Sequence, residues 1–288
     1  MIHLSLPIRP RVNVRCEYLL TPISIMLEQG GKKVLCLSTI KTTGTPAVTT
    51  EYTETLTHKL GHFWRIFQDS DINFLQFALP LIDKTLSPYK KMVKVRTCVC
   101  GAYEELENAR MFDLRRVVNN KCVHCEAELQ QQEQDVLLSD ITWPTPNEFT
   151  CNRTWSASDL KRFWERQTKT HKISKRKEPI KLSCEGLEFG IRYQIIWSAM
   201  IVYLSKIEND KDVMLHYVQK VQDKAFFVSS LAKMMSPDIQ LNFRALPVVW
   251  LDGAPLISEC SPSQVKLLGK GLNTKRKELQ ISLKSWRY

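Results

Sequence analysis

The 288-residue sequence lacks the long hydrophobic runs that would place it across a membrane. Its most apolar stretch, residues 193–204, has twelve residues, whereas a membrane-spanning helix needs about 18 or more. The first residues carry Pro7 and Pro10 and lack a long apolar segment after a basic start. We therefore expect no signal peptide, no helical presequence and no transmembrane segment.

The short motifs of the common enzyme classes are also missing. The sequence contains no P-loop, no G-x-G-x-x-G, no G-x-S-x-G and no carboxylate cluster with metal-binding spacing. His58 and His62 lie four residues apart, as in H-E-x-x-H metalloproteases, but Lys59 occupies the position of the general-base glutamate. These absences favour a protein without catalytic residues, although they leave the question of an enzyme open.

A complete disulfide framework is excluded, because the nine cysteines are an odd number. Without a signal peptide, we expect the thiols to be reduced and the protein to be cytoplasmic, nuclear or both.

Four of these cysteines form a pattern that is typical of a metal site. Cys98 and Cys100 flank one residue, Gly101 follows them, and Cys122 and Cys125 form a C-x-x-C pair. Zn²⁺ prefers four soft ligands in a tetrahedron, and each close pair supplies two ligands from one turn. We therefore predict a structural zinc ion. A redox-active C-x-x-C pair is the alternative, and His124 or the distant His216 are possible replacements for one cysteine.

Basic residues outnumber acidic ones by 41 to 30, which gives a net charge of +11 and a pI near 9.2. Such a surplus favours polyanionic partners. Two segments carry most of it, and their aromatic residues can either stack on unpaired bases or belong to the core. The predicted nucleic-acid contacts are Lys161, Arg162, Arg166, Lys175, Arg176, Lys177, Lys275, Arg276 and Lys277. Nuclear import or an acidic protein partner are the alternative uses of these residues.

Residues 126–140 are acidic and resemble a helix that directly follows Cys125. A helix there would complete a treble-clef or ribbon-like zinc module. Its negative charge excludes nucleic-acid contact but leaves a protein partner possible.

The pattern of elements predicts an α+β fold in three parts. Residues 1–57 should be β-rich, residues 58–150 helical with a zinc module at 90–140, and residues 151–288 basic and mainly helical. Within these parts we predict helices at 58–67, 71–82, 156–172 and 211–235, a strand at 90–98 and a β-hairpin around the Asp252-Gly253 turn. Pro80 should kink or shorten its helix.

One short stretch resembles a known family. Lys59-Leu-Gly-His62 is similar to the H-x-G-H adenylate-binding motif of class I aminoacyl-tRNA synthetases, which often carry zinc knuckles. Lys59 replaces the first histidine, and no KMSKS-like sequence follows. The likeness covers four residues, and we do not assign the chain to that family from it.

The sequence thus favours a non-enzymatic, zinc-stabilised protein that binds RNA or DNA. The alternatives are a protein-interaction or assembly factor, such as a viral accessory or matrix-like protein or an adaptor, and an enzyme that acts on nucleic acid.

Overall fold

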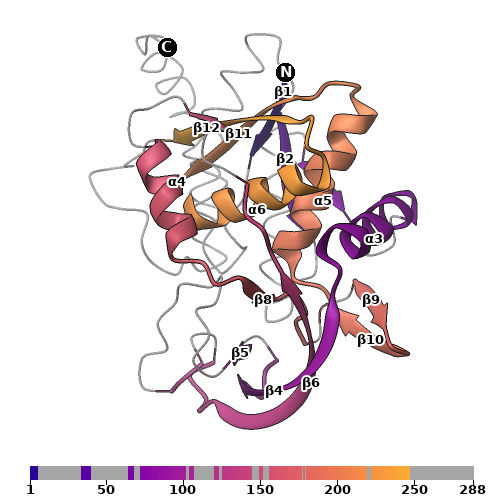
Figure 1. Cartoon of the computed structure of the whole chain (residues 1–288), viewed down its shortest axis with the longest axis vertical. Helices are drawn as coiled ribbons and strands as arrows, with labels where there is room; N and C mark the ends of the chain where they lie inside the picture. Colours follow the sequence, from indigo (N-terminus) through magenta and orange to yellow (C-terminus); the bar gives the residue numbers. More distant parts are fainter. Residues whose placement is uncertain are drawn as a thin grey trace, which may run out of the picture.

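The protein is seen in a computed structural model (Figure 1). It describes residues 1–5, 34–39, 64–67, 72–101, 104–106, 120–122, 125–144, 149–151, 156–176, 178, 180–218 and 222–246. No helix among these residues has the length and apolar character needed to cross a membrane.

A six-stranded parallel sheet joins distant parts of the chain. Its order is β3-β2-β1-β11-β12-β7, and every neighbouring pair runs parallel. The strands are β1 (Ile2–Ser5), β2 (Val34–Thr39), β3 (Trp64–Phe67), β7 (Phe149–Cys151), β11 (Asp212–Val218) and β12 (Gln240–Leu246). Strands β2 and β3 lie on one side of β1, whereas β11, β12 and β7 lie on its other side. The strand order therefore reverses between β1 and β11.

The described helices are α3 (Ile72–Leu86), α4 (Ser156–Glu165), α5 (Tyr193–Ile207) and α6 (Gln222–Met235). Helix α5 is apolar nearly all round, and twelve of its fifteen residues are buried. Helix α6 connects β11 to β12 and packs on α5. Phe226 of α6 contacts Tyr217 and Phe243 of the two strands, with ring centroids 6.2 and 5.3 Å away. The main core therefore lies between the parallel sheet and these two helices.

A second sheet is antiparallel and has the order β5-β4-β6-β8. It consists of β4 (Tyr89–Thr97), β5 (Glu104–Leu106), β6 (Gln130–Asp140) and β8 (Thr170–Lys172). The long strands β4 and β6 reach away from α5 and α6, below them in the view of Figure 1. The strands β9 (Lys181–Cys184) and β10 (Leu187–Gly190) form a separate antiparallel ribbon.

The predicted α+β class is confirmed only in the coarser sense that the chain mixes helices and strands. The described C-terminal part contains strands as well as helices, because residues 212–218, predicted as helix, form β11. Val213, Leu215 and Tyr217 alternate along β11 and are fully buried, which is the period of a strand. Within the predicted helix at 211–235, residues 222–235 form α6, which ends before Ser236-Pro237 as expected.

The other predicted helices and strands agree with the structure to different degrees. The strand at 90–98 is confirmed by β4. Residues 193–204, the most apolar stretch of the sequence, belong to helix α5, and nearly all of them are buried. Residues 64–67, predicted as helix, form β3. The helix at 71–82 is confirmed as α3, but it continues past Pro80 to Leu86. Residues 58–63 and the hairpin at Asp252-Gly253 lie outside the described residues, and the division into domains stays a prediction.

Candidate functional site

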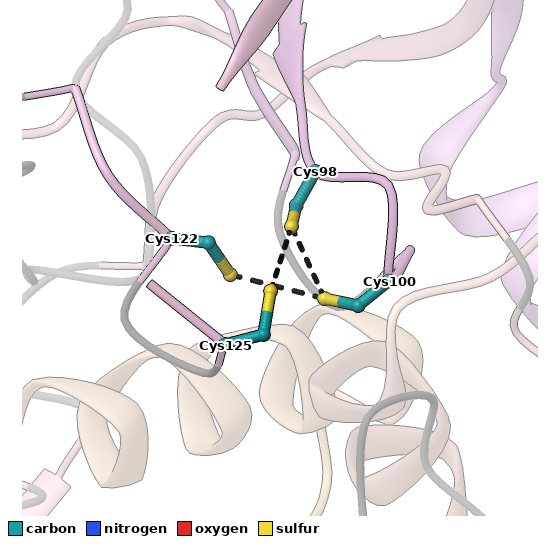
Figure 2. A group of neighbouring side chains, drawn as sticks. All are labelled: Cys98, Cys100, Cys122 and Cys125. Atoms are coloured by element: carbon teal, nitrogen blue, oxygen red, sulfur yellow. Dashed lines mark hydrogen bonds between the residues drawn. The ribbon is translucent and has the colours of Figure 1, made fainter. Parts of the chain in front are cut away.

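The four predicted cysteine ligands converge at one end of the antiparallel sheet (Figure 2). Their sulfur atoms all lie within 4.8 Å of one another, and the set can hold a metal ion. The Sγ atom of Cys98 lies 3.2 Å from that of Cys100 and 3.3 Å from that of Cys125, and Cys100 and Cys122 are 3.8 Å apart. Ligands about 2.3 Å from a tetrahedral Zn²⁺ are about 3.8 Å from each other. The cluster therefore has the size of a tetrahedral thiolate site.

Two tight turns bring the cysteines together. After β4 the chain turns at Cys98, whose carbonyl accepts a hydrogen bond from the N–H of Gly101 at 2.9 Å. Gly101 has a φ of +68°, so glycine suits this turn. In the second turn the carbonyl of Cys122 accepts from the N–H of Glu126, and the N–H of Cys122 donates to Ala127, both at 2.8 Å.

Buried apolar contacts support the cluster, and its thiols differ in their environment. Cys98 and Cys122 are fully buried and pack with Leu129. Burial raises the pKa of the Cys98 thiol, whereas the backbone N–H of Ala127 lowers the pKa of the exposed Cys125. Since a metal binds thiolates, loading this site must release protons.

The chain after Cys125 does not form the predicted acidic helix. Residues 130–140 form β6, which pairs with β4 through residues 130–138 and with β8 through residues 138–140. A treble-clef module is wrong for this reason, and the ribbon-like alternative is the one that the strands resemble. The acidic helix expected to contact a protein partner at 126–140 is therefore not formed, and a protein contact through this segment stays a prediction.

The predicted nucleic-acid contacts are not brought together as one exposed group. Lys161 and Arg162 are exposed on α4, and Arg166 is exposed directly after it. Lys175 is buried, with its ammonium 2.8 Å from the Glu178 carboxylate. Arg176 is half-buried, and Lys177, Lys275, Arg276 and Lys277 lie outside the described residues, as does the alternative ligand His124. His216 lies on β11 in the parallel sheet and outside the cysteine cluster.

The aromatic residues between these cations belong to the core. Phe163 is buried, and its ring centroid lies 5.8 Å from that of Phe226. The indole N–H of Trp164 donates to Ser230 at 3.3 Å. Because both side chains face α6, they do not form a platform for unpaired bases.

Sequence reasoning missed a second candidate site at the carboxyl ends of β1 and β11. In open parallel sheets, ligands bind outside the carboxyl ends of the strands where the strand order reverses. Here Ser5 ends β1 and pairs with His216 near the end of β11. Helix α6 begins four residues after Val218, the last residue of β11. The signal for this site was the parallel topology, which the sequence analysis did not predict.

No family model matches the sequence. No curated protein matches it either. The fold is similar to solved structures of Mycobacterium tuberculosis methionyl-tRNA synthetase. The complex with methionyl-adenylate matches with a TM-score of 0.55 and 10% identity, over 84% of this chain and 56% of that chain. The apo form matches with a TM-score of 0.53 and 11% identity, over 85% of this chain and 56% of that chain. The chain thus spans little more than half the length of these enzymes, and the likeness shows a shared fold.

This similarity contradicts the prediction of a non-enzymatic nucleic-acid-binding protein, since the neighbours are enzymes. Net charge, on which that prediction depended, reflects solubility and partners but not the fold. The likeness of Lys59-Leu-Gly-His62 to the synthetase motif covers too few residues to outweigh it. That stretch lies outside the described residues, shortly before β3 in the sequence.

Proposed function

We propose that the parallel sheet binds an aminoacyl-adenylate, or the amino acid and ATP from which it forms, at the carboxyl ends of β1 and β11. The observation that carries this proposal is the reversal of strand order between these strands, in a fold similar to an enzyme solved with methionyl-adenylate. Helix α6 begins four residues after β11 ends, and the N–H groups at a helix start favour phosphate. Since folds host many functions, the binding site itself must be tested.

A calorimetric titration of the whole chain tests this function. The probes are ATP, methionine and a non-hydrolysable sulfamoyl analogue of methionyl-adenylate. We expect the analogue to bind more tightly than either ATP or methionine, because it occupies both subsites at once. The His216→Ala variant should bind it at least about tenfold more weakly, and a loss of tenfold corresponds to about 1.4 kcal/mol.

A matched control is His3→Ala, which lies on β1 two residues before Ser5 and should leave the affinity unchanged. Absence of heat with all three probes, at millimolar concentration, would contradict adenylate binding. Pyrophosphate exchange measured on the same protein then separates an enzyme that forms the adenylate from a protein that only binds it.

We propose in addition that the cysteine cluster holds one structural Zn²⁺. Four sulfur ligands leave no position for water, so the ion would support folding and would not take part in a reaction. Metal analysis of reduced, purified protein should give one zinc per chain, and the Cys98→Ser variant should lose it. Less than about half an equivalent in the wild type would refute the proposal. Cys184→Ser, which changes a described cysteine outside the cluster, is the matched control.

A further inference from the structure

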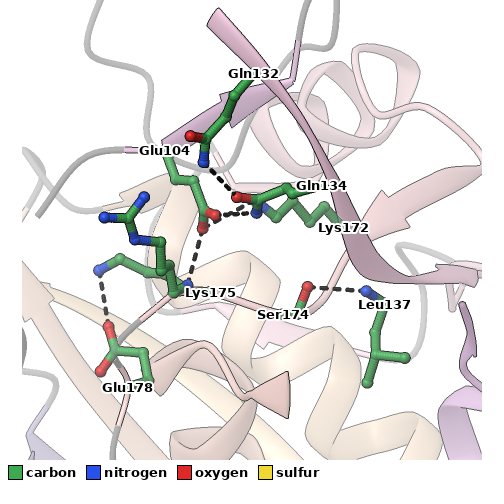
Figure 3. A network of polar contacts seen from close by, with 9 residues as sticks. Glu104, Gln132, Gln134, Leu137, Lys172, Ser174, Lys175 and Glu178 are labelled. Atoms are coloured by element: carbon green, nitrogen blue, oxygen red, sulfur yellow. Dashed lines mark hydrogen bonds and ion pairs between the residues drawn. The ribbon is translucent and has the colours of Figure 1, made fainter. Parts of the chain in front are cut away.

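A buried ion pair lies between the cysteine cluster and the start of α5. The Lys172 ammonium of β8 is 2.9 Å from the Glu104 carboxylate of β5, and both side chains are at most 2% exposed. The N–H of Arg176 donates to the same carboxylate at 2.9 Å, and the Gln134 amide of β6 donates to its other oxygen. We call these four residues the Glu104 network (Figure 3).

The Glu104 network is joined directly to the metal ligands on one side. Glu104 follows Cys100 by four residues, and in the β4–β5 ladder it is paired with Thr97, the residue before Cys98. Strand β4 ends at Thr97, directly before Cys98, and β5 begins three residues after Gly101. A change in the first cysteine turn would therefore shift β5 relative to β4, and with it the Glu104 carboxylate.

On the other side, the network is joined to the central helix by backbone hydrogen bonds. Lys172 is followed by Ile173, whose N–H donates to Leu137 at 2.9 Å and whose carbonyl accepts from Arg192 at 3.0 Å. Arg192 is the residue before α5, and its carbonyl accepts from the N–H groups of Ile195 and Ile196. The backbone next to Lys172 thus holds Arg192, and Arg192 in turn accepts the first hydrogen bonds of α5.

The Glu104 carboxylate and the Lys172 ammonium are both buried, so each charge is stabilised by the other rather than by water. Burial alone would raise the pKa of Glu104, but Lys172 and the N–H of Arg176 outweigh it and lower that pKa. Separating Glu104 from Lys172 leaves a buried ammonium near two further cations, Arg192 and Lys175. An uncompensated buried charge is far more costly than the intact pair.

We propose that the Glu104 network couples the cysteine cluster to helix α5, so that residues 193–196 at the start of α5 are well ordered only while the cysteines hold a metal ion. We call this coupling the latch. With metal bound, the first turn holds β5 on β4, and Glu104 neutralises Lys172. When the metal leaves, β5 loosens, the pair separates, and the Ile173–Arg192 contact loosens with it. This inference rests on the proposed metal site and is independent of adenylate binding.

Hydrogen exchange of the whole chain, measured with the metal bound and after chelation, tests the latch. In the wild type, chelation should increase exchange at the cysteine turns and also in the first turn of α5, residues 193–196. In the Glu104→Gln/Lys172→Met double variant, chelation should still increase exchange at the cysteine turns but should leave the α5 start unchanged. The double variant avoids an unpaired buried charge, so it should fold.

The single variant Glu104→Gln supplies a second readout. It should loosen residues 193–196 while the metal content stays at the wild-type level, because the carboxylate is not a ligand. The matched control is the Arg96→Met/Glu105→Gln variant, which removes a 3.0 Å ion pair from the same two strands but on their more exposed side. This control should respond to chelation as the wild type does.

Three results would overturn the latch. The first is a metal-loaded wild type in which chelation leaves residues 193–196 unchanged. The second is a double variant whose α5 start responds as strongly as that of the wild type. The third, a protein that binds no metal, would overturn the metal site together with the latch. None of the three affects the adenylate proposal, which the titration tests separately.

Discussion

At the scale of single residues, the buried His171 of β8 makes the stability of the protein depend on pH. His171 is 3% exposed, and its ring meets that of Trp143 edge to face at 5.1 Å between centroids. Burial lowers the pKa of His171 to about 4, and the nearby Arg192 acts in the same direction, against the Thr168 carbonyl and Asp140. The folded protein therefore holds a neutral imidazole under ordinary conditions.

This pKa predicts acid destabilisation. Because the unfolded imidazole has a pKa of about 6.5, the unfolded chain takes up the proton first as the pH falls. The contribution of His171 to stability is complete above about pH 6.5 and is lost progressively down to about pH 4. The total loss is about 3 kcal/mol.

Denaturant unfolding of the wild type and of His171→Gln, followed from pH 7.5 to pH 4, measures this contribution. The difference in stability between the two proteins should shift in favour of the variant as the pH falls. A constant difference across that range would show that the imidazole is not shielded from water.

At the scale of elements, two close approaches of the backbone fix how the β9–β10 ribbon joins the body. The N–H of Lys175 donates to the carbonyl of Gly190 at 2.6 Å. A Cβ atom added at Gly190 would lie 2.5 Å from the carbonyl oxygen of Lys175 and 3.0 Å from backbone atoms of Glu178. Since these neighbours are backbone atoms, they cannot move aside as a flexible side chain would.

We therefore expect Gly190→Ala to lower the free energy of unfolding by about 1–3 kcal/mol. The exposed Glu188 on the same strand offers a matched comparison, and Glu188→Ala should change stability by about 0.5 kcal/mol or less. Equal stability of the two variants would show that the segment at Lys175–Glu178 can withdraw from β10.

Elements formed by local sequence were predictable, and those formed by distant partners were not. The strand at 90–98 was recognisable from its alternation. The apolar stretch at 193–204 indicated a buried segment but did not decide that it is a helix. Residues 130–134 are Gln, Gln, Gln, Glu and Gln, which favour a helix, but pairing with β4 makes them a strand. Pro80 is exposed within α3, and the helix continues beyond it because its neighbours Ala78 and Ile82 are buried.

The same distinction applies to the candidate sites. The four cysteines were predicted because each pair forms its turn locally. The basic neighbours of Lys175 predict a surface cation. Its acidic partner Glu178 is only three residues away, but this turn is buried against the distant β10, where the carbonyl of Gly190 accepts a hydrogen bond from the N–H of Lys175. The Glu104–Lys172 pair joins residues that are far apart in sequence, so no local pattern indicates it.

At the scale of the whole molecule, the chain combines a parallel sheet with an antiparallel module that ends in the cysteine cluster. The parallel sheet takes β1 and β2 from the start of the chain and β11 and β12 from its second half, so the reversal between β1 and β11 exists only in the folded protein. The antiparallel module is connected to α5 through the Glu104 network and Ile173. The proposed ligand site and the proposed metal site therefore lie on different sheets of one fold.

The central claim is that an adenylate binds where the strand order reverses, between β1 and β11. Hydrogen exchange with and without the sulfamoyl analogue of methionyl-adenylate tests the place as well as the fact of binding. We predict protection at the carboxyl ends of β1 and β11 and at the start of α6, and unchanged exchange in the antiparallel sheet. Unchanged exchange at the β1–β11 ends, or protection confined to the cysteine module, would contradict the account.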